Sequence, residues 1–177
     1  MRFGLIPALV LSLTATAARA SVIVPLALDD LVDASEHVAL VRVEYQAARW
    51  STDHSVIYTD VTLRVLQPMK GGAPAGSLLT VRREGGVVGN IGLRVHGAAG
   101  FTEGEEAVVF LQRRGAALWT VGMAQGKMRV TTVDGARVAV RSTPGLTYLR
   151  PQAASEPTVM TVEELTARVT ARAAVGR

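Results

Sequence analysis

The stretch Ile57-Tyr58-Thr59-Asp60-Val61-Thr62-Leu63-Arg64-Val65-Leu66 carries the clearest structural pattern in this chain of 177 residues. From Ile57 to Val65, every second position is apolar or threonine, and most positions between them are polar. Because successive side chains of a strand point to opposite faces, this alternation predicts a half-buried β-strand.

Weaker versions of the same alternation recur at short intervals along the chain. They are Val38 to Tyr45, Leu78 to Arg83, Ile91 to His96, Glu106 to Gln112, Leu118 to Ala124, Lys127 to Val133 and Ala136 to Arg141. Gly, Pro and Asp signals separate these segments, as is typical of small sandwiches and barrels. We therefore expect a mainly β fold.

The last two segments predict a hairpin around an Asp-Gly pair. A two-residue loop would place arginines on the face that carries Met128 and Val130. A three-residue loop over residues 133–135 would instead pair Val130 with Val138 and Met128 with Val140, which gives one apolar face. The pattern favours this bulged hairpin.

Two short helices are expected to flank the sheet. Residues 28–35 place Leu28, Leu31 and Val32 together at helical spacing. Near the other end, Thr161 begins a capping box, followed by an apolar stripe of Val162, Leu165 and Val169. The predicted organisation is a signal peptide over 1–20, a β-barrel domain over 21–150, and a linker with a C-terminal helix over 151–177.

The first twenty residues resemble a secretory signal peptide. Arg2 begins the segment, an apolar run follows, and Ala18 and Ala20 occupy the small-residue positions that signal peptidase requires before Ser21. The alternative is an uncleaved anchor, but the apolar run is shorter than the roughly 20 residues that span a bilayer. We expect export to the periplasm or the medium, with no stable membrane span.

Composition narrows the function classes. The chain has no cysteine, which excludes disulfides, thiolate metal ligands and thiol catalysis. Removing residues 1–20 takes away two arginines and no acidic residue, which lowers the formal net charge from +4 to +2. Aromatic residues make up only 5% of the chain, so a basic groove with stacking aromatics is not expected. Nucleic acid is therefore not an expected partner.

Recognisable catalytic and metal-binding motifs are missing from the sequence. No serine lies in a Gly-x-Ser-x-Gly elbow, and the histidines His37, His54 and His96 are widely spaced. The stretch from Gly85 to Gly104 is rich in glycine but lacks the phosphate-loop ending. It is expected to form bulges and corners of a bent sheet, or else a mobile loop that carries side chains to a ligand. No cofactor is expected.

The order of elements resembles a recurring module of exported bacterial proteins. The resemblance rests on residues 34–43, on residues 58–65 followed by Met69-Lys70-Gly71, and on Glu84-Gly85-Gly86, Val95-His96-Gly97 and residues 101–111. It covers Leu28 to Arg129. The succession of strands is also similar to netrin-like domains, including tissue inhibitors of metalloproteinases. This similarity implies a small, closed or partly open antiparallel β-barrel that is OB-like. Ser21 stands where those inhibitors have a cysteine, so the similarity implies no functional residue.

These observations favour a non-catalytic binding or interaction module whose partner is an envelope or extracellular protein. Its candidate interaction surface comprises Lys70, Gly71, Glu84, Gly85, Gly86, Asn90 and His96. The alternative is an exported hydrolase in which His96 works with a carboxylate. That alternative requires His96 and Glu84 to converge in one cleft with Asp60 or Glu103. The ligand and the oligomeric state stay open at this level.

Overall fold

The structure is a computed structural model, and it describes residues 21–144, 146–148 and 159–175. The predicted signal peptide, with Ala18 and Ala20, lies outside the described residues, as does the linker predicted over residues 151–157. Ser21 is the first described residue and begins strand β1. No helix in the described ranges combines the length and the apolar character needed to cross a membrane.

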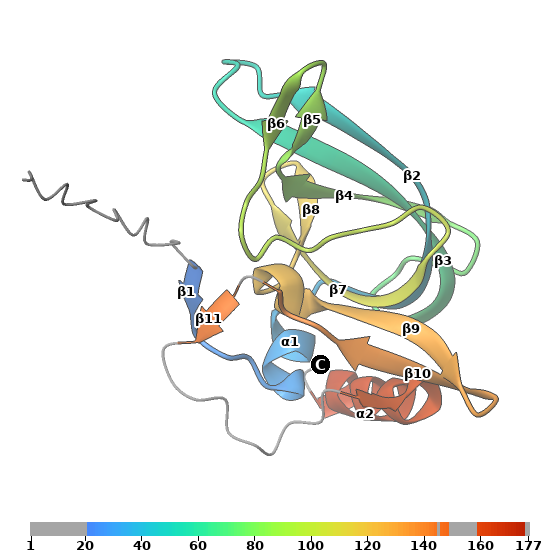
Figure 1. Cartoon of the computed structure of the whole chain (residues 1–177). Coiled ribbons are helices and arrows are strands. Elements are labelled where there is room, and N and C mark those ends of the chain that lie inside the picture. The colour runs from blue at the N-terminus through green and yellow to red at the C-terminus, as the bar shows by residue number, and fades with distance from the viewer. Residues whose placement is uncertain (1–20, 145, 149–158, 176–177) are drawn as a thin grey trace, which may run out of the picture.

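The described part of the chain is mainly β with two short α-helices, as predicted (Figure 1). The helices are α1 (Leu28–Ala34) and α2 (Val162–Val175), and a 3-10 turn, η1, covers Met123–Gly126. The strands are β1 (Ser21–Ile23), β2 (His37–Trp50), β3 (Ile57–Lys70), β4 (Leu78–Glu84), β5 (Gly86–Val88), β6 (Ile91–Leu93), β7 (Glu106–Arg114), β8 (Ala117–Thr120), β9 (Lys127–Val133), β10 (Ala136–Arg141), β11 (Leu146–Tyr148) and β12 (Val159–Thr161).

Most strands belong to one large mixed sheet with the order β12-β10-β9-β7-β2-β3-β4-β8. Strand β8 pairs with β4 in parallel and also with the second half of β7. The pairings β7-β2-β3-β4-β8 therefore return to β7 and form a ring of five strands. Register shifts between β2 and β3 mark irregularities of the β-bulge kind, which bend strands. The first half of β7 pairs with β9, so the sheet branches there.

The first half of β2 and most of β7 are buried on both faces, and each face belongs to a different hydrophobic cluster. The inner cluster lies within the five-strand ring and includes Val41, Val61, Leu63, Val81, Val109 and Leu111. The outer cluster joins the other face of the sheet to both helices and includes Leu31, Leu40, Phe110, Met128, Leu165 and Val169. The apolar residues predicted for the two helices are thus buried, as expected.

The predicted bulged hairpin is wrong. Residue Val130 pairs with Ala139 and Met128 pairs with Arg141, so the loop is the two-residue turn Asp134-Gly135. Both turn residues have positive φ, which is the type I′ geometry that Asp-Gly favours. The sequence argument rejected this register because it buries an arginine. The structure does bury Arg141, whose guanidinium donates to the Leu26 carbonyl at 3.1 Å.

Two other predicted strands are shorter than expected. The strand predicted over residues 91–96 ends at Leu93, because the chain turns at 96–97 instead of continuing. The strand predicted over residues 118–124 ends at Thr120, and η1 begins three residues later. Both truncations leave irregular backbone at one end of the five-strand ring, where the candidate site lies.

Candidate ligand-binding site

The residues of the predicted interaction surface lie at opposite ends of β3. Lys70 ends that strand, and its ammonium donates to the Val32 carbonyl at 2.6 Å, at the end of α1. Gly71 follows with a φ of +89°, and a Cβ there would lie 2.5 Å from the Glu36 carbonyl oxygen. Lys70 therefore holds the end of α1 against the sheet, and Gly71 packs against the start of β2. The structure does not bring either residue to the glycine-rich segment.

The other predicted residues gather around the β5–β6 hairpin, at the beginning of β3. Thr59 donates its hydroxyl to the Gly85 carbonyl at 2.6 Å, which fixes the entry to the hairpin. Gly86 has a φ of +145°, and a Cβ there would lie 2.8 Å from the Ala48 Cβ. Glycine is thus required where β5 crosses closely over β2 and β3. Glu84 and Asn90 are exposed beside it.

A cavity of about 550 Å³ opens between this hairpin and the chain that follows it. Its charged or ionisable lining consists of Arg83, Arg94 and His96, and no carboxylate lines it. The remaining lining is apolar or glycine, including Leu93 and Pro144. Of the predicted surface, His96 and Gly86 line this cavity. Its character is cationic and partly apolar.

Arg83 is the exceptional side chain of this cavity. It is half-buried, and its Nε is buried without an acceptor among the described residues. No ion pair involves it within the described ranges. Burial lowers the pKa of the Arg83 guanidinium from its ordinary value. A guanidinium normally offers five donors in a rigid fork that suits carboxylates and phosphates. Arg83 therefore offers unused donors beside an open cavity.

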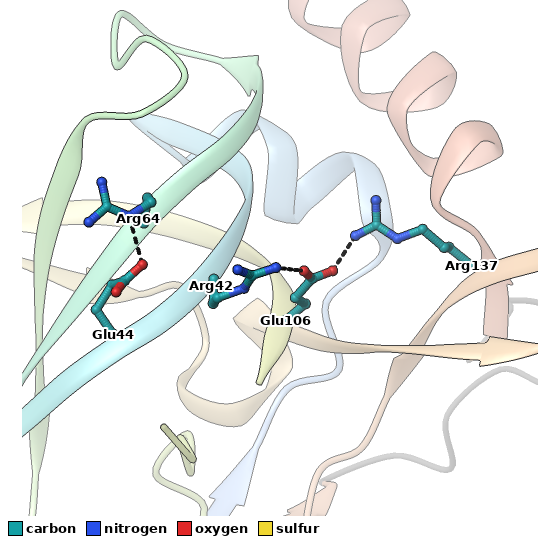
Figure 2. Close-up of polar contacts among 5 residues, drawn as sticks. All are labelled: Arg42, Glu44, Arg64, Glu106 and Arg137. Carbon is teal, nitrogen blue, oxygen red and sulfur yellow. Dashed lines mark hydrogen bonds and ion pairs between the residues drawn. The ribbon is translucent and has the colours of Figure 1, made fainter. Parts of the chain in front are cut away.

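Several arginines elsewhere on the sheet are paired with carboxylates. In Figure 2, Glu106 on β7 accepts from Arg42 on β2 at 2.7 Å and also from Arg137 on β10. Arg64 on β3 donates to Glu44 at 2.7 Å. The hydrogen bond from Arg42 lowers the pKa of Glu106, so that carboxylate stays ionised near neutral pH. Arg83, on the inward face of β4, has no such carboxylate partner within the described ranges.

A second cavity, of about 300 Å³, continues the first and shares Gly100 and Pro144 with it. Its charged lining is Lys127, Arg129 and Glu105. The Lys127 ammonium donates to Glu105 and to the Gly100 carbonyl. Its positive charge is therefore already paired with Glu105. Arg129 is exposed. The two cavities together form a groove with an excess of positive charge.

The groups of the hydrolase hypothesis are not gathered in this groove. Asp60 accepts from Arg49 and Arg82, at 2.8 Å in each case. Glu103 accepts the Gln46 backbone N–H at 3.1 Å. Neither carboxylate lines a cavity with His96. Within the described ranges, no cluster of three or more acidic or histidine side chains could hold a metal ion.

Comparisons of the chain with protein-family models, curated proteins and solved structures found no match. The residues of the groove are therefore the basis for assigning a function.

Arg83 and Arg94 were not among the residues singled out from the sequence. The alternation of β4 carried a usable signal, because Leu79, Val81 and Arg83 share one face and Val81 is fully buried. Arg83 is thus the charged continuation of the inward face.

Proposed function

We propose that this protein is an exported, non-catalytic binding module, and that its cationic groove receives an anionic group of the ligand. The observation that carries the proposal is Arg83, a half-buried guanidinium with an unpaired Nε in a cavity without carboxylates. Leaving a buried donor without a partner costs free energy, about 1–3 kcal/mol, and more when the group is charged. An anion bound beside the Arg83 guanidinium would offset part of that cost, with Arg94 adding positive charge in the same cavity.

The proposal includes the finer fold prediction, that the five-strand ring is an OB-like barrel. Support comes from the circular pairing of β7, β2, β3, β4 and β8, and from the apolar inner cluster within the ring. OB-type barrels bind ligands through outer strand faces and loops. The groove is built by the long connection between β4 and β7, at one end of the ring.

Export is part of the proposal as well. Its support is the leader pattern of residues 1–20, with Ala18 and Ala20 before Ser21. Cleavage after Ala20 would make Ser21 the first residue of the mature chain, and Ser21 begins β1. The test is the intact mass of the protein recovered from the periplasm or the medium. A mass that retains residues 1–20 would contradict this part.

Binding is tested with two anionic probes, fluorescently labelled polyglutamate and polygalacturonate, and with polylysine as the cationic control. Arg83→Gln is the test variant, and Arg64→Gln is the matched control, because it removes the same charge from a site paired with Glu44. Charge-assisted hydrogen bonds contribute about 1.5–3 kcal/mol, so Arg83→Gln should weaken binding of the anion at least about tenfold. Equal affinity of the two variants for both anions would overturn the proposal.

A further inference from the structure

The β5–β6 hairpin has one covered side and one open side. It forms a two-stranded sheet of its own, in which Val87 pairs with Gly92. Gly86 at the start of β5 lies against Thr59 and Ala48, so β5 is the strand that faces β3 and β2. Figure 1 shows the hairpin at the end of the molecule opposite α1 and α2. Strand β6 therefore forms the outer edge.

The turn of the hairpin determines which backbone groups of β6 face outward. The turn residues are Gly89, with a φ of +58°, and Asn90, which gives the two-residue loop typical of type II′ hairpins. Such a turn joins Val88 and Ile91 by a hydrogen bond. Antiparallel pairs alternate between bonded and non-bonded, so Val87 and Gly92 form a non-bonded pair. The N–H and C=O of Gly92 are therefore directed away from β5.

The same edge continues to Arg94. A Cβ on Gly85 would lie 2.7 Å from the Leu93 carbonyl oxygen and 3.5 Å from the Val95 nitrogen, so both groups face the β5 side. In an extended chain, backbone groups alternate sides from one residue to the next. The polar backbone groups of Arg94 thus face outward, as those of Gly92 do. An added strand pairs with the outward N–H and C=O groups of every second residue, and Gly92 and Arg94 have this spacing.

The side chains beside this edge are apolar and unusually exposed. Val87 is 68% exposed, Ile91 56% and Leu93 37%. Natural edge strands are usually protected by charges, prolines or bulges, and β6 itself carries none of these charges or prolines. The positive charges of Arg83 and Arg94 and the imidazole of His96 lie next to it in the groove. The edge thus combines free backbone groups, apolar contact area and positive charge.

We propose that the β6 edge binds an extended acidic segment of a partner protein as an additional strand, with its carboxylates directed to Arg83 and Arg94. This rests on the proposed function, because it uses the same cationic groove. Backbone pairing with Gly92 and Arg94 would hold the segment, and its acidic side chains would set the preference. Apolar side chains alternating with the acidic ones would cover Ile91 and Leu93, which lie on the face of β6 opposite Gly92.

The experiment uses synthetic peptides as probes of the full mature chain. The first peptide alternates Glu and Val over eight residues, and the second replaces Glu with Lys. Two further peptides are the acidic peptide N-methylated at one or the other set of alternate residues. N-methylation keeps the charge and removes backbone donors, so it separates strand pairing from simple attraction. Gly92→Pro is a second probe on the protein side, because proline is tolerated at an edge but donates no hydrogen bond. Circular dichroism of Gly92→Pro checks that the variant folds.

We expect the acidic peptide to bind and the Lys peptide not to bind. N-methylation on the donor-bearing edge and Gly92→Pro should each weaken binding about tenfold, because each removes backbone hydrogen bonds. If peptides N-methylated on either register bind as tightly as the parent, the strand inference is overturned, while loss of binding in Arg83→Gln would still support the groove. If Arg83→Gln also binds normally, the proposed function fails as well. A dimer of the free protein that Gly92→Pro dissociates would assign the edge to a second copy of this chain, and would also overturn the inference.

Discussion

Replacing Lys127 with methionine should destabilise the protein, because Lys127 holds residues 100–105 in place beside the groove. The Lys127 side chain is 12% exposed, and it donates to Glu105 and to the Gly100 carbonyl. Its ammonium also lies 4.7 Å from the centre of the Phe101 ring. Glu105 in turn accepts the Thr102 N–H at 2.9 Å, so one cation organises residues 100–105.

The magnitude follows from the burial of the pair. Burial lowers the pKa of Lys127, and the hydrogen bond and charge of Glu105 oppose that effect. Removing one partner of a buried ion pair costs about 3–5 kcal/mol, because the other charge stays buried without compensation. Glu105 is 13% exposed, so some water reaches the pair and we expect about 3 kcal/mol.

The assay is urea unfolding followed by the fluorescence of Trp50 and Trp119, applied to a double-mutant cycle. The cycle comprises Lys127→Met, Glu105→Gln and the double variant, which should lose at least about 1 kcal/mol less than the sum of the single losses. Arg129→Met is the matched control, because Arg129 lies two residues along the same strand and is exposed. It should change stability by less than about 0.5 kcal/mol. A Lys127→Met loss no larger than that of Arg129→Met, or an additive cycle, would refute the reasoning.

Three further predictions concern other parts of the protein. Gly126→Ala should destabilise the folded protein by more than about 2 kcal/mol, because a Cβ there would clash with the Val121 carbonyl oxygen. Gly100→Ala is the control, because a Cβ there would meet no atom within 4 Å. Thermal melting compares the two variants. Glu106 has its pKa lowered by Arg42 from an ordinary 4.5, so its stabilisation is present above that pH and is lost as pH falls. Glu106→Gln should flatten the decline of the free energy of unfolding below about pH 4.5, measured by urea titration at several pH values. Arg83→Gln should leave stability unchanged or raise it by up to about 1 kcal/mol, measured without ligand, because it removes an unpaired, half-buried charge.

Local patterns predicted most strands but not which of them are buried on both faces. The alternation of residues 57–66 predicted β3 correctly, because one face of that strand lines the inner cluster and the other is more exposed. The runs 38–41 and 107–111 are continuously apolar, and their meaning depends on helices that approach from distant parts of the sequence. The prediction for the Asp-Gly turn was wrong because keeping arginines off the apolar face was given more weight than the preference of Asp-Gly for a two-residue turn.

The site was only partly predictable because pairing between charges is a long-range property. The sequence directed attention to Gly86 and His96, which do line the groove. It could not distinguish Arg82, which pairs with Asp60, from Arg83, which does not. Adjacent arginines on a strand point to opposite faces, and only the fold determines which face offers a carboxylate.

Unpaired charge at the groove has a thermodynamic consequence for binding. Arg83 and Arg129 both act on Lys127 by repulsion, which lowers the pKa of Lys127 further than burial alone. Like charges held close together by a folded chain oppose folding, and a bound anion would relieve that repulsion. Anion binding should therefore stabilise the folded protein, and the stabilisation should increase with the logarithm of anion concentration above the Kd. The pairing of Glu105 with Lys127 limits the repulsion while leaving Arg83 available. The unpaired positive charge of the groove thus lowers the free energy of unfolding, and a bound anionic ligand would offset this loss. Such a cost in stability is common at functional sites.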